Sequence, residues 1–450
     1  MPILVSRECS RTDGHPDLPE ARGIGRVQKQ ALFSSFIGWM FDGYETSTLI
    51  LVGAAAMISL LPAPDPASVQ WGVGLSIGST LLGWALGGVI GSVFADYVGR
   101  KPMLIISIAG YSAFTALTAL SPNLHSLIAL RFLTGLFLGS EWSTGTAMIA
   151  ETWPASARAK ALGIMQSGFG FGFLLASGMW LILQPLLGSE GWRWMFAFGV
   201  LPALFLMFIR RELPESQVWL DAIRRRQWTT TEHKGAQPSL TDKRPFTLRQ
   251  IMSDPLSRSR ILKTLAITCI TVAVFYGTSS LIPPYVGSIA TKAGLDGRYW
   301  ASMTAVVYNV GAIAGYISAG FIADAIGRKP YMLFLFTGGL LTGPIMFLIP
   351  PVLTSALGAS AVLGFFTLGA FSWMPIYLPE LFATNVRSTA SGFVFNLARL
   401  IAFPAPIYAA WLFTVLGGPA RSVTTLSLLF LVSLIVVCFL PETKGKALPE

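Results

Sequence analysis

The chain has 450 residues, of which 53% are hydrophobic and only 12% are charged, and its mean hydropathy is +0.61. This composition excludes an ordinary soluble domain and indicates a membrane protein. A formal net charge of +10 is compatible with nucleic-acid binding, but the basic residues gather in loops on one side of the apolar runs, so we expect no nucleic-acid partner.

The chain contains twelve long apolar runs. Each has about 20 residues or more, enough to cross a hydrocarbon layer of roughly 30 Å as a helix. The runs are too long and too continuous for barrel strands of about ten alternating residues. The sequence therefore predicts an all-α membrane protein with twelve transmembrane helices, near residues 31–58, 71–95, 103–121, 125–149, 159–184, 193–211, 261–288, 299–323, 331–350, 354–379, 388–415 and 420–440.

The first span contains two acids, in Asp42-Gly43-Tyr44-Glu45. An acid at the centre of a membrane helix costs about 2.5–3.5 kcal/mol on insertion scales, so such residues are functional by default. We predict that Glu45 carries a proton, because burial raises the proton affinity of a carboxylate and a nearby cation that moves can lower it. Asp42 is a second candidate, and Tyr44 a candidate substrate contact. The alternative is that Asp42 caps or kinks the helix and Glu45 only pairs with a base.

The second span carries Gly83, Gly87 and Gly91, a ridge of small residues at four-residue spacing. Such a ridge lets two helix backbones approach closely. It predicts packing rather than chemistry.

A polar stretch, Asp96 to Pro102, follows this ridge and returns almost unchanged as Asp324 to Pro330, 228 positions later. Other landmarks repeat at nearly the same interval, which predicts a chain made of two similar halves. The pattern Asp-x-x-Gly-Arg-Lys between two spans resembles the signature of the major facilitator superfamily. Gly320 matches a further glycine of that signature, whereas Ser92 replaces it in the first copy.

This resemblance implies two pseudo-symmetric six-helix bundles that alternate access to a central site. The expected organisation is an N-terminal tail over 1–30, a first bundle over 31–211, a linker over 212–260, a second bundle over 261–440 and a tail over 441–450.

The first span also resembles transporter motifs. Asp-Gly-Tyr-Glu is similar to the Asp-Gly-x-Asp of aromatic-acid and other organic-acid proton symporters, and Gly-Tyr-Glu-Thr to the Gly-Tyr-Asp-Thr of proton-coupled sugar porters. In the latter pattern the acid takes the proton; here it is Glu45, one methylene longer.

The fourth span reads Arg131-x-x-x-Gly135-x-x-x-Gly139 and resembles the superfamily motif in which an arginine pairs with the first-helix acid. The alternative is that Arg131 extends to the outer surface. Glu141 is either a second proton relay or a residue that holds a neighbouring helix.

Eight charged residues flank the loops on one side of the spans. By resemblance they form the clusters that hold the two bundles together in the outward-open form, and a plain network of ion pairs in the loops is the alternative. They are Asp96, Arg100, Glu151, Arg158, Asp324, Arg328, Glu380 and Arg387.

Candidates for substrate contact lie in later spans. Gln166 of the fifth span either faces the cavity or bonds a neighbouring helix. Arg399 of the eleventh span, near Asn396, resembles an arginine of organic-acid symporters, and its planar guanidinium suits a carboxylate. An ion pair with a membrane acid is the alternative, yet no second-half span contains an acid. Aromatic residues either line the site or only pack, namely Tyr308, Trp373 and Tyr377.

The basic loops place both termini and the linker in the cytoplasm, by the positive-inside rule. We expect a monomer in the cell (plasma or inner) membrane that contacts lipids, with no cofactor and no metal, because the three histidines are isolated. The predicted function is proton-coupled uptake of a small organic anion, such as an aromatic or other carboxylic acid, with Glu45, Arg131 and Arg399 facing a shared aqueous pocket.

Four alternatives remain. One is a proton-coupled porter of sugars or other metabolites, although the seventh span lacks the glutamine-rich pattern of sugar porters. Another is a proton antiporter that exports drugs or organic cations. A receptor that has lost transport and an enzyme are less favoured, since no signalling domain and no pairing of a nucleophile with a base is found.

Overall fold

The computed structural model describes residues 24–225, 245–348, 352–402 and 405–449, and these residues form helices and connecting turns without strands. The prediction of an all-α membrane protein is confirmed. Within the described ranges, eight helical segments are individually long and apolar enough to span a membrane, and the other predicted spans also fall in helices.

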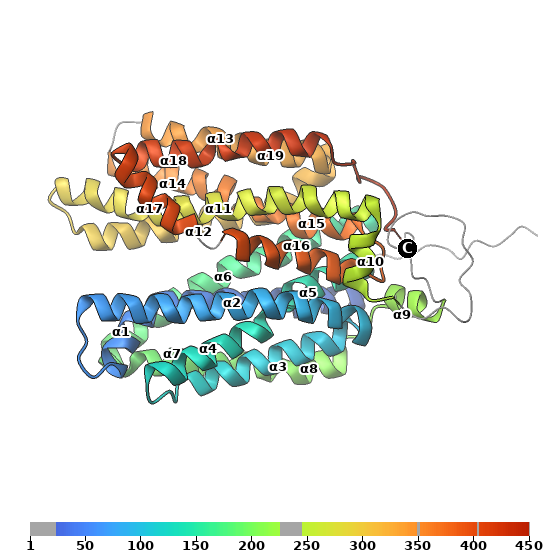
Figure 1. Cartoon of the computed structure of the whole chain (residues 1–450), viewed down its shortest axis with the longest axis horizontal. Helices are drawn as coiled ribbons and strands as arrows, with labels where there is room; N and C mark the ends of the chain where they lie inside the picture. The colour runs from blue at the N-terminus through green and yellow to red at the C-terminus, as the bar shows by residue number, and fades with distance from the viewer. Residues whose placement is uncertain (1–23, 226–244, 349–351, 403–404, 450) are drawn as a thin grey trace, which may run out of the picture.

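The first half forms one group of helices, the lower group in Figure 1. It consists of α1 Arg26–Leu60, α2 Pro66–Val98, α3 Arg100–Thr118, α4 Leu124–Leu138, α5 Glu141–Thr152, α6 Ala155–Leu187, α7 Gly191–Ala197 and α8 Leu201–Glu212, with 3₁₀ turns at Gly188–Glu190 and Phe198–Val200. The fourth predicted span is thus divided between α4 and α5.

The second half forms the upper group, and two short helices lie between the groups in sequence, α9 Gln217–Arg224 and α10 Thr247–Ser253. The upper group consists of α11 Pro255–Lys292, α12 Gly297–Ile326, α13 Arg328–Leu348, α14 Leu353–Thr367, α15 Trp373–Leu381, α16 Arg387–Ala402, α17 Ala405–Leu416, α18 Pro419–Ser427 and α19 Leu429–Cys438. A 3₁₀ turn, Gly369–Ser372, divides the tenth predicted span as the fourth is divided.

The repeated polar stretch forms the same sharp turn in both halves. Gly99 and Gly327 have φ angles of 106° and 103°, which only glycine adopts readily. Each turn ends at the start of a helix, where a later glutamate accepts hydrogen bonds from the free backbone N–H groups: Glu215 at α3 and Glu442 at α13. Burial acts to raise the pKa of Glu442, but the backbone N–H groups of Arg328 and Lys329, together with those of Thr443 and Lys444 next to Glu442, outweigh it and hold the pKa below its usual value.

The glycine ridge of α2 packs directly on α4. A Cβ atom at Gly87 would lie 1.8 Å from the carbonyl oxygen of Leu136, and one at Gly83 would lie 2.2 Å from that of Phe132. Gly311 of α12 meets α14 in the same way in the second half. The ridges therefore fix the distance between backbones inside each group.

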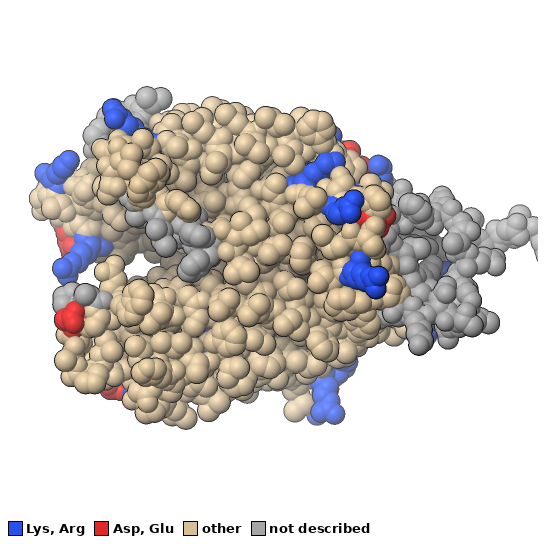
Figure 2. All heavy atoms as spheres, viewed as in Figure 1, with Lys and Arg blue, Asp and Glu red and all other residues tan. Residues whose placement is uncertain are grey.

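The two groups meet along two pairs of helices, α2 with α16 and α6 with α12. Small residues permit the contact: Gly88 touches the side chain of Asn396, and Gly320 touches the backbone of Lys160. Figure 2 shows a hollow between the groups at the end away from α9 and α10, and charged side chains at both ends of an uncharged belt. The molecule thus opens at the end away from α9 and α10.

Gly87→Ala should lower the stability of the folded protein by about 1–3 kcal/mol, because the added methyl group meets backbone that cannot move aside. The measurement is the midpoint of thermal unfolding in detergent. Gly78→Ala in the same helix is the matched control, since nothing lies within 4 Å of its added Cβ, and it should leave the midpoint unchanged or raise it. Equal midpoints for the two variants would contradict this view of the α2–α4 contact.

Candidate functional site

Glu45 of α1 and Arg131 of α4 form an ion pair inside the first group. The Nη1 atom of Arg131 lies 3.0 Å from Oε2 of Glu45, and both residues are fully buried. The guanidinium of Arg131 also lies over the ring of Phe196, 5.2 Å from its centroid. The alternative of an Arg131 that reaches the outer surface is therefore wrong. The expectation that this pair faces a pocket shared by both groups is also wrong, because the pair is enclosed within one of them.

Tyr44 points into the same group rather than toward substrate. Its hydroxyl donates a hydrogen bond of 2.7 Å to the carbonyl oxygen of Met195 in α7. Its predicted role as a substrate contact is therefore not supported, since its polar atom is used to join α1 to α7.

Asp42 and Glu141 form a second acidic site, at the break between α4 and α5. The chain leaves α4 at Gly139, and Glu141 begins α5, so that its carboxyl group lies on Gly38 of α1, where a Cβ atom would be 1.6 Å from Oε1. Asp42 follows Gly38 by four residues on α1, so it lies one helical turn from the Glu141 carboxyl group. The four carboxylate oxygens of Asp42 and Glu141 have no hydrogen-bond partner within the described part of the chain.

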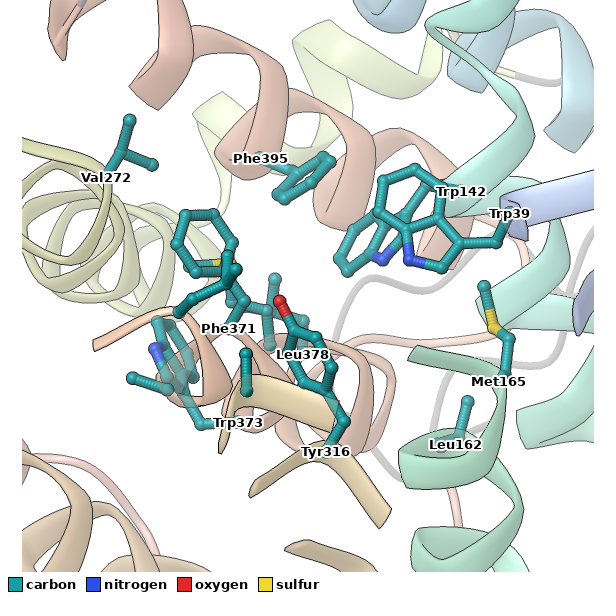
Figure 3. Close-up of a cluster of buried hydrophobic side chains, with 14 of the residues drawn as sticks. Trp39, Trp142, Leu162, Met165, Val272, Tyr316, Phe371, Trp373, Leu378 and Phe395 are labelled. Atoms are coloured by element: carbon teal, nitrogen blue, oxygen red, sulfur yellow. The ribbon is translucent and has the colours of Figure 1, made fainter. Parts of the chain in front are cut away.

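An aromatic stack joins the two groups next to this acidic site. Trp142 of α5 stacks on Phe395 of α16, with ring centroids 3.9 Å apart and an interplanar angle of 19°. Figure 3 shows Trp39 and Trp142 of the first group opposite Phe395 and Tyr316 of the second. The indole N–H of Trp142 donates to Oε1 of Gln166 at 2.9 Å. Gln166 thus forms a hydrogen bond with a neighbouring helix, which is one of the two alternatives that the sequence left open.

Arg399 lies on the second group and faces the first. Its guanidinium is 4.1 Å from the ring centroid of Trp84 in α2 and 4.2 Å from that of Phe395. The side chain is only half-buried although it lies twelve residues into the span that starts at Arg387, or about 18 Å along the helix. Among the described residues it has no ion pair, and its Nη1 atom has no hydrogen-bond partner.

Asn396 belongs to the packing between groups. It is fully buried, its side-chain nitrogen donates to the carbonyl oxygen of Gly392 at 2.8 Å, and its amide rests on Gly88 of α2. The structure therefore corrects its prediction as a substrate contact, because α2 occupies the space in front of it.

The three predicted aromatic residues of the second half also pack inside their own group. The hydroxyl groups of Tyr308 and Thr367 form a hydrogen bond. Trp373 is fully buried, and its ring lies edge-on to that of Phe336. The hydroxyl group of Tyr377 donates a hydrogen bond to the carbonyl oxygen of Pro441. Tyr377 thus lies near the α9–α10 end. The alternative of packing holds for these three, and the sequence could not distinguish the two roles, since membrane cores and binding sites both use aromatic residues.

The charged residues near the α9–α10 end form two clusters, and the first connects the groups. Arg100 pairs with Asp96 and with Glu151, each at 2.8 Å, and Glu151 also binds Arg387 of α16 at 2.8 Å. Asp96 accepts 2.7 and 2.6 Å hydrogen bonds from the backbone and hydroxyl of Thr389. This cluster therefore joins α2, α3 and α5 to the start of α16.

The second cluster, built from the repeated residues, stays mainly within the second group. Arg328 pairs with Asp324 and Glu380, each at 2.9 Å. The first group supplies Lys160, whose Nζ is 4.0 Å from Asp324, and Arg158, whose charge interacts with that of Glu380. All eight predicted residues thus lie in these two clusters, although their role in gating stays a prediction.

Residue patterns did not predict the aromatic residues around Arg399. Trp39, Trp84, Trp142 and Phe395 lie on four helices that are far apart in sequence. Two local signals point to them: Phe395 precedes Arg399 by four residues, one helical turn, and Trp142 directly follows Glu141. The described residues contain no cluster of three His, Cys, Asp or Glu able to hold a metal ion.

The chain matches the family model described as "Sugar (and other) transporter" over residues 43–450. It is 30% identical to a putative metabolite transport protein of Haemophilus influenzae, covering 93% of this chain and 97% of the relative. A probable 4-methylmuconolactone transporter of Cupriavidus pinatubonensis is 27% identical, over 94% and 92%. The niacin transporter NiaP of Acinetobacter baylyi is 28% identical, over 94% and 96%.

Among solved structures, the proton:xylose symporter XylE of the major facilitator superfamily aligns with a TM-score of 0.71 at 20% identity, covering 94% of this chain and 98% of that one. This likeness supports the fold. Together with the match of the family model, it shows that the chain belongs to the sugar (and other) transporter family of the major facilitator superfamily, and that it is a multi-pass membrane transporter rather than an enzyme.

Proposed function

We propose that this transporter imports a small organic anion together with protons, by alternating access. The observation that carries the proposal is Arg399, a cation on the inner face of one group that has no ion pair among the described residues. A fixed cation without a counter-charge is costly in a membrane interior, which favours a mobile anion as its partner.

The relatives support an organic acid as the substrate class. The niacin transporter is named for a pyridine carboxylic acid, and a carboxylate matches the two-pronged donor geometry of a guanidinium. Trp84 and Phe395, which flank Arg399, supply apolar surface next to the charge. A carrier of organic cations is disfavoured, because Arg399 would repel its substrate.

The pair of Glu45 and Arg131 is the proposed switch for the driving proton. Protonation of Glu45 removes one side of a buried ion pair and frees Arg131 to shift within the first group. Helices 31–211 and 261–440 then rock as two bundles, with 212–260 as the linker, about the contacts of α2 with α16 and α6 with α12.

The charge distribution gives the proposed orientation. The α9–α10 end carries most of the basic loops, so it lies in the cytoplasm with both termini, and the hollow faces outward. The cluster around Glu151 keeps the cytoplasmic side closed in this state. Each net charge that moves inward gains about 2.3 kcal/mol per 100 mV of membrane potential. The protein acts as a monomer surrounded by lipid.

The test is uptake of radiolabelled niacin, cis,cis-muconate or xylose into proteoliposomes, with an imposed inward proton gradient. Accumulation of a carboxylate above its outside concentration, abolished by a protonophore, supports the proposal. Accumulation of xylose alone would favour a sugar porter, and proton-driven loss of an organic cation from loaded vesicles would favour an exporter.

Arg399→Gln should weaken binding of the transported carboxylate at least about thirtyfold, because losing one side of a buried charge pair costs about 2 kcal/mol or more. Arg399→Lys should recover part of the affinity, since it keeps the charge and loses the paired donors. The measurement is the ligand-induced shift in thermal unfolding. Arg298→Gln, an exposed arginine of the same half, is the control, and equal affinities in Arg399→Gln and this control would contradict the assignment.

Glu45→Gln should exchange substrate across the membrane but fail to concentrate it, because a permanently neutral side chain cannot respond to the proton gradient. The measurement compares counterflow with gradient-driven uptake in the same proteoliposomes. Glu190→Gln, an exposed glutamate of the same half, should behave as the wild type. Undiminished accumulation by Glu45→Gln would mean that the proton site lies elsewhere.

A further inference from the structure

We propose that a groove between the start of α11 and the end of α19 binds the headgroup of an anionic phospholipid, with Arg260 and Lys263 as its cationic contacts. The groove lies on the second group, away from Arg399 and from the Glu45–Arg131 pair. The inference therefore goes beyond the proposed function, and it can be tested without knowing the substrate.

The groove lies where two membrane helices end side by side. α11 and α19 pack against each other, and Figure 1 shows the start of α11 and the end of α19 at the same end of the molecule as α10. Leu256 and Phe439 line the groove and remain 43% and 68% exposed. Since the spans cross the hydrocarbon layer, their ends and this groove lie at the level of the lipid headgroups.

The lining of the groove is positively charged. The groove encloses about 320 Å³, and Arg260 and Lys263 are the charged side chains among its described lining residues. Neither forms an ion pair in the described part of the chain. Glu380 lines an adjoining cavity together with Arg260, but its carboxylate already pairs with Arg328 at 2.9 Å. The groove thus presents two positive charges to whatever enters it.

Both cations have donors that the described residues do not use. Arg260 donates from Nη1 to the carbonyl oxygen of Leu381 at 2.7 Å, whereas its buried Nε atom has no hydrogen-bond partner among the described residues. Lys263 donates one hydrogen bond of 3.3 Å, to the carbonyl oxygen of Phe439, and an ammonium group has three donors. A phosphate group suits such a pair, because its several oxygens accept charge-assisted hydrogen bonds.

The surface next to the groove suits acyl chains. Leu431, Ile435 and Phe439 follow one another at four-residue spacing along α19, and all three are exposed. Residues four apart lie on the same face of a helix. This apolar face leads from the groove along the span, so a molecule whose charged head binds in the groove can lay its chains on it. Charge and apolar surface together favour a phospholipid over a free phosphate ion.

The equivalent place in the first half is occupied by an acid. Leu213-Pro214-Glu215 repeats as Leu440-Pro441-Glu442, so Glu212 is equivalent to Phe439. Glu212 lines a groove near the start of α1 and the end of α8, where it pairs with Arg26. The first groove therefore contains its own counter-charge, whereas the second has an exposed aromatic residue in that position and leaves its cations to an outside partner.

The test is thermal unfolding of the purified transporter in detergent, titrated with phosphatidylglycerol, with phosphatidylcholine or with inorganic phosphate. A ligand that binds the folded state raises the unfolding midpoint. We expect phosphatidylglycerol to raise it more than phosphatidylcholine does, and inorganic phosphate to leave it unchanged. The difference between the two lipids should shrink when salt is raised from about 0.05 M to about 0.5 M, because exposed charges are screened.

Variants of the groove should weaken the binding of phosphatidylglycerol. Arg260→Gln and Lys263→Gln should each do so about fivefold, the contribution of one basic residue at an anionic membrane surface. Phe439→Glu, which gives the second groove the acid of the first, should weaken it more than either. Lys29→Gln, an exposed basic residue of the first groove, is the matched control and should bind as the wild type does. If Arg260→Gln does not fold, Lys263→Gln and Phe439→Glu make the same comparison.

Cys438 reports where the lipid binds, because it is exposed and lines the groove. In a background of Cys9→Ala and Cys269→Ala it is the remaining thiol of the chain. Its rate of reaction with a water-soluble maleimide is measured in lipid nanodiscs of phosphatidylcholine with and without phosphatidylglycerol. We expect phosphatidylglycerol to slow this reaction, and to slow it less when Lys263→Gln is added.

Three outcomes would overturn the inference. They are equal midpoint shifts with the two lipids, a shift with inorganic phosphate as large as that with phosphatidylglycerol, and a loss of binding in Lys29→Gln as large as in Lys263→Gln. None of them involves Arg399 or Glu45, so they leave the proposed function standing. Failure of proton-driven carboxylate uptake would likewise leave this lipid site standing.

Discussion

A charged side chain inside a membrane protein needs an oppositely charged partner, and most of the buried arginines of this transporter have one. Arg131 forms an ion pair with Glu45, Arg100 forms ion pairs with Asp96 and Glu151, and Arg328 forms ion pairs with Asp324 and Glu380. Arg399 lies against the aromatic rings of Trp84 and Phe395 and has no ion pair among the residues that the structure describes. Arg399, the arginine without an ion pair, lies where the two groups face each other, at the depth expected for the binding site of such a transporter.

The two halves are similar in backbone but not in charge. Both contain the sharp glycine turn, the glycine ridge and a divided fourth helix. The first half holds the buried acids of the spans, whereas the second contributes Arg399. The arginine cluster differs in the same way, because Glu151 reaches across to Arg387 and its counterpart Glu380 stays with Arg328. Duplication supplied the scaffold, and substitution in each copy made the two faces complementary.

The fold could be predicted from the sequence because its signals are long or repeated. Runs of about 20 apolar residues identify membrane helices directly, and a motif that returns at half-chain spacing identifies the two halves. The ion pair of Glu45 with Arg131 could also be predicted, since both residues are costly in lipid and follow known motifs. The directions of individual side chains could not be predicted from the sequence. Tyr44, one residue from Glu45, points to α7, and Asn396, three residues from Arg399, is covered by α2. Such differences depend on which helix lies opposite each residue, and a single sequence does not show which helices are neighbours.

The glutamates that accept hydrogen bonds from the turns at Gly99 and Gly327 bear on how far each half depends on the other. Glu215 follows the sixth predicted span and Glu442 follows the twelfth, and each reaches back to the helix start within its own half. Each half therefore contains everything needed to anchor its third helix. The start of the third helix in one half is therefore held in place without the glutamate of the other half.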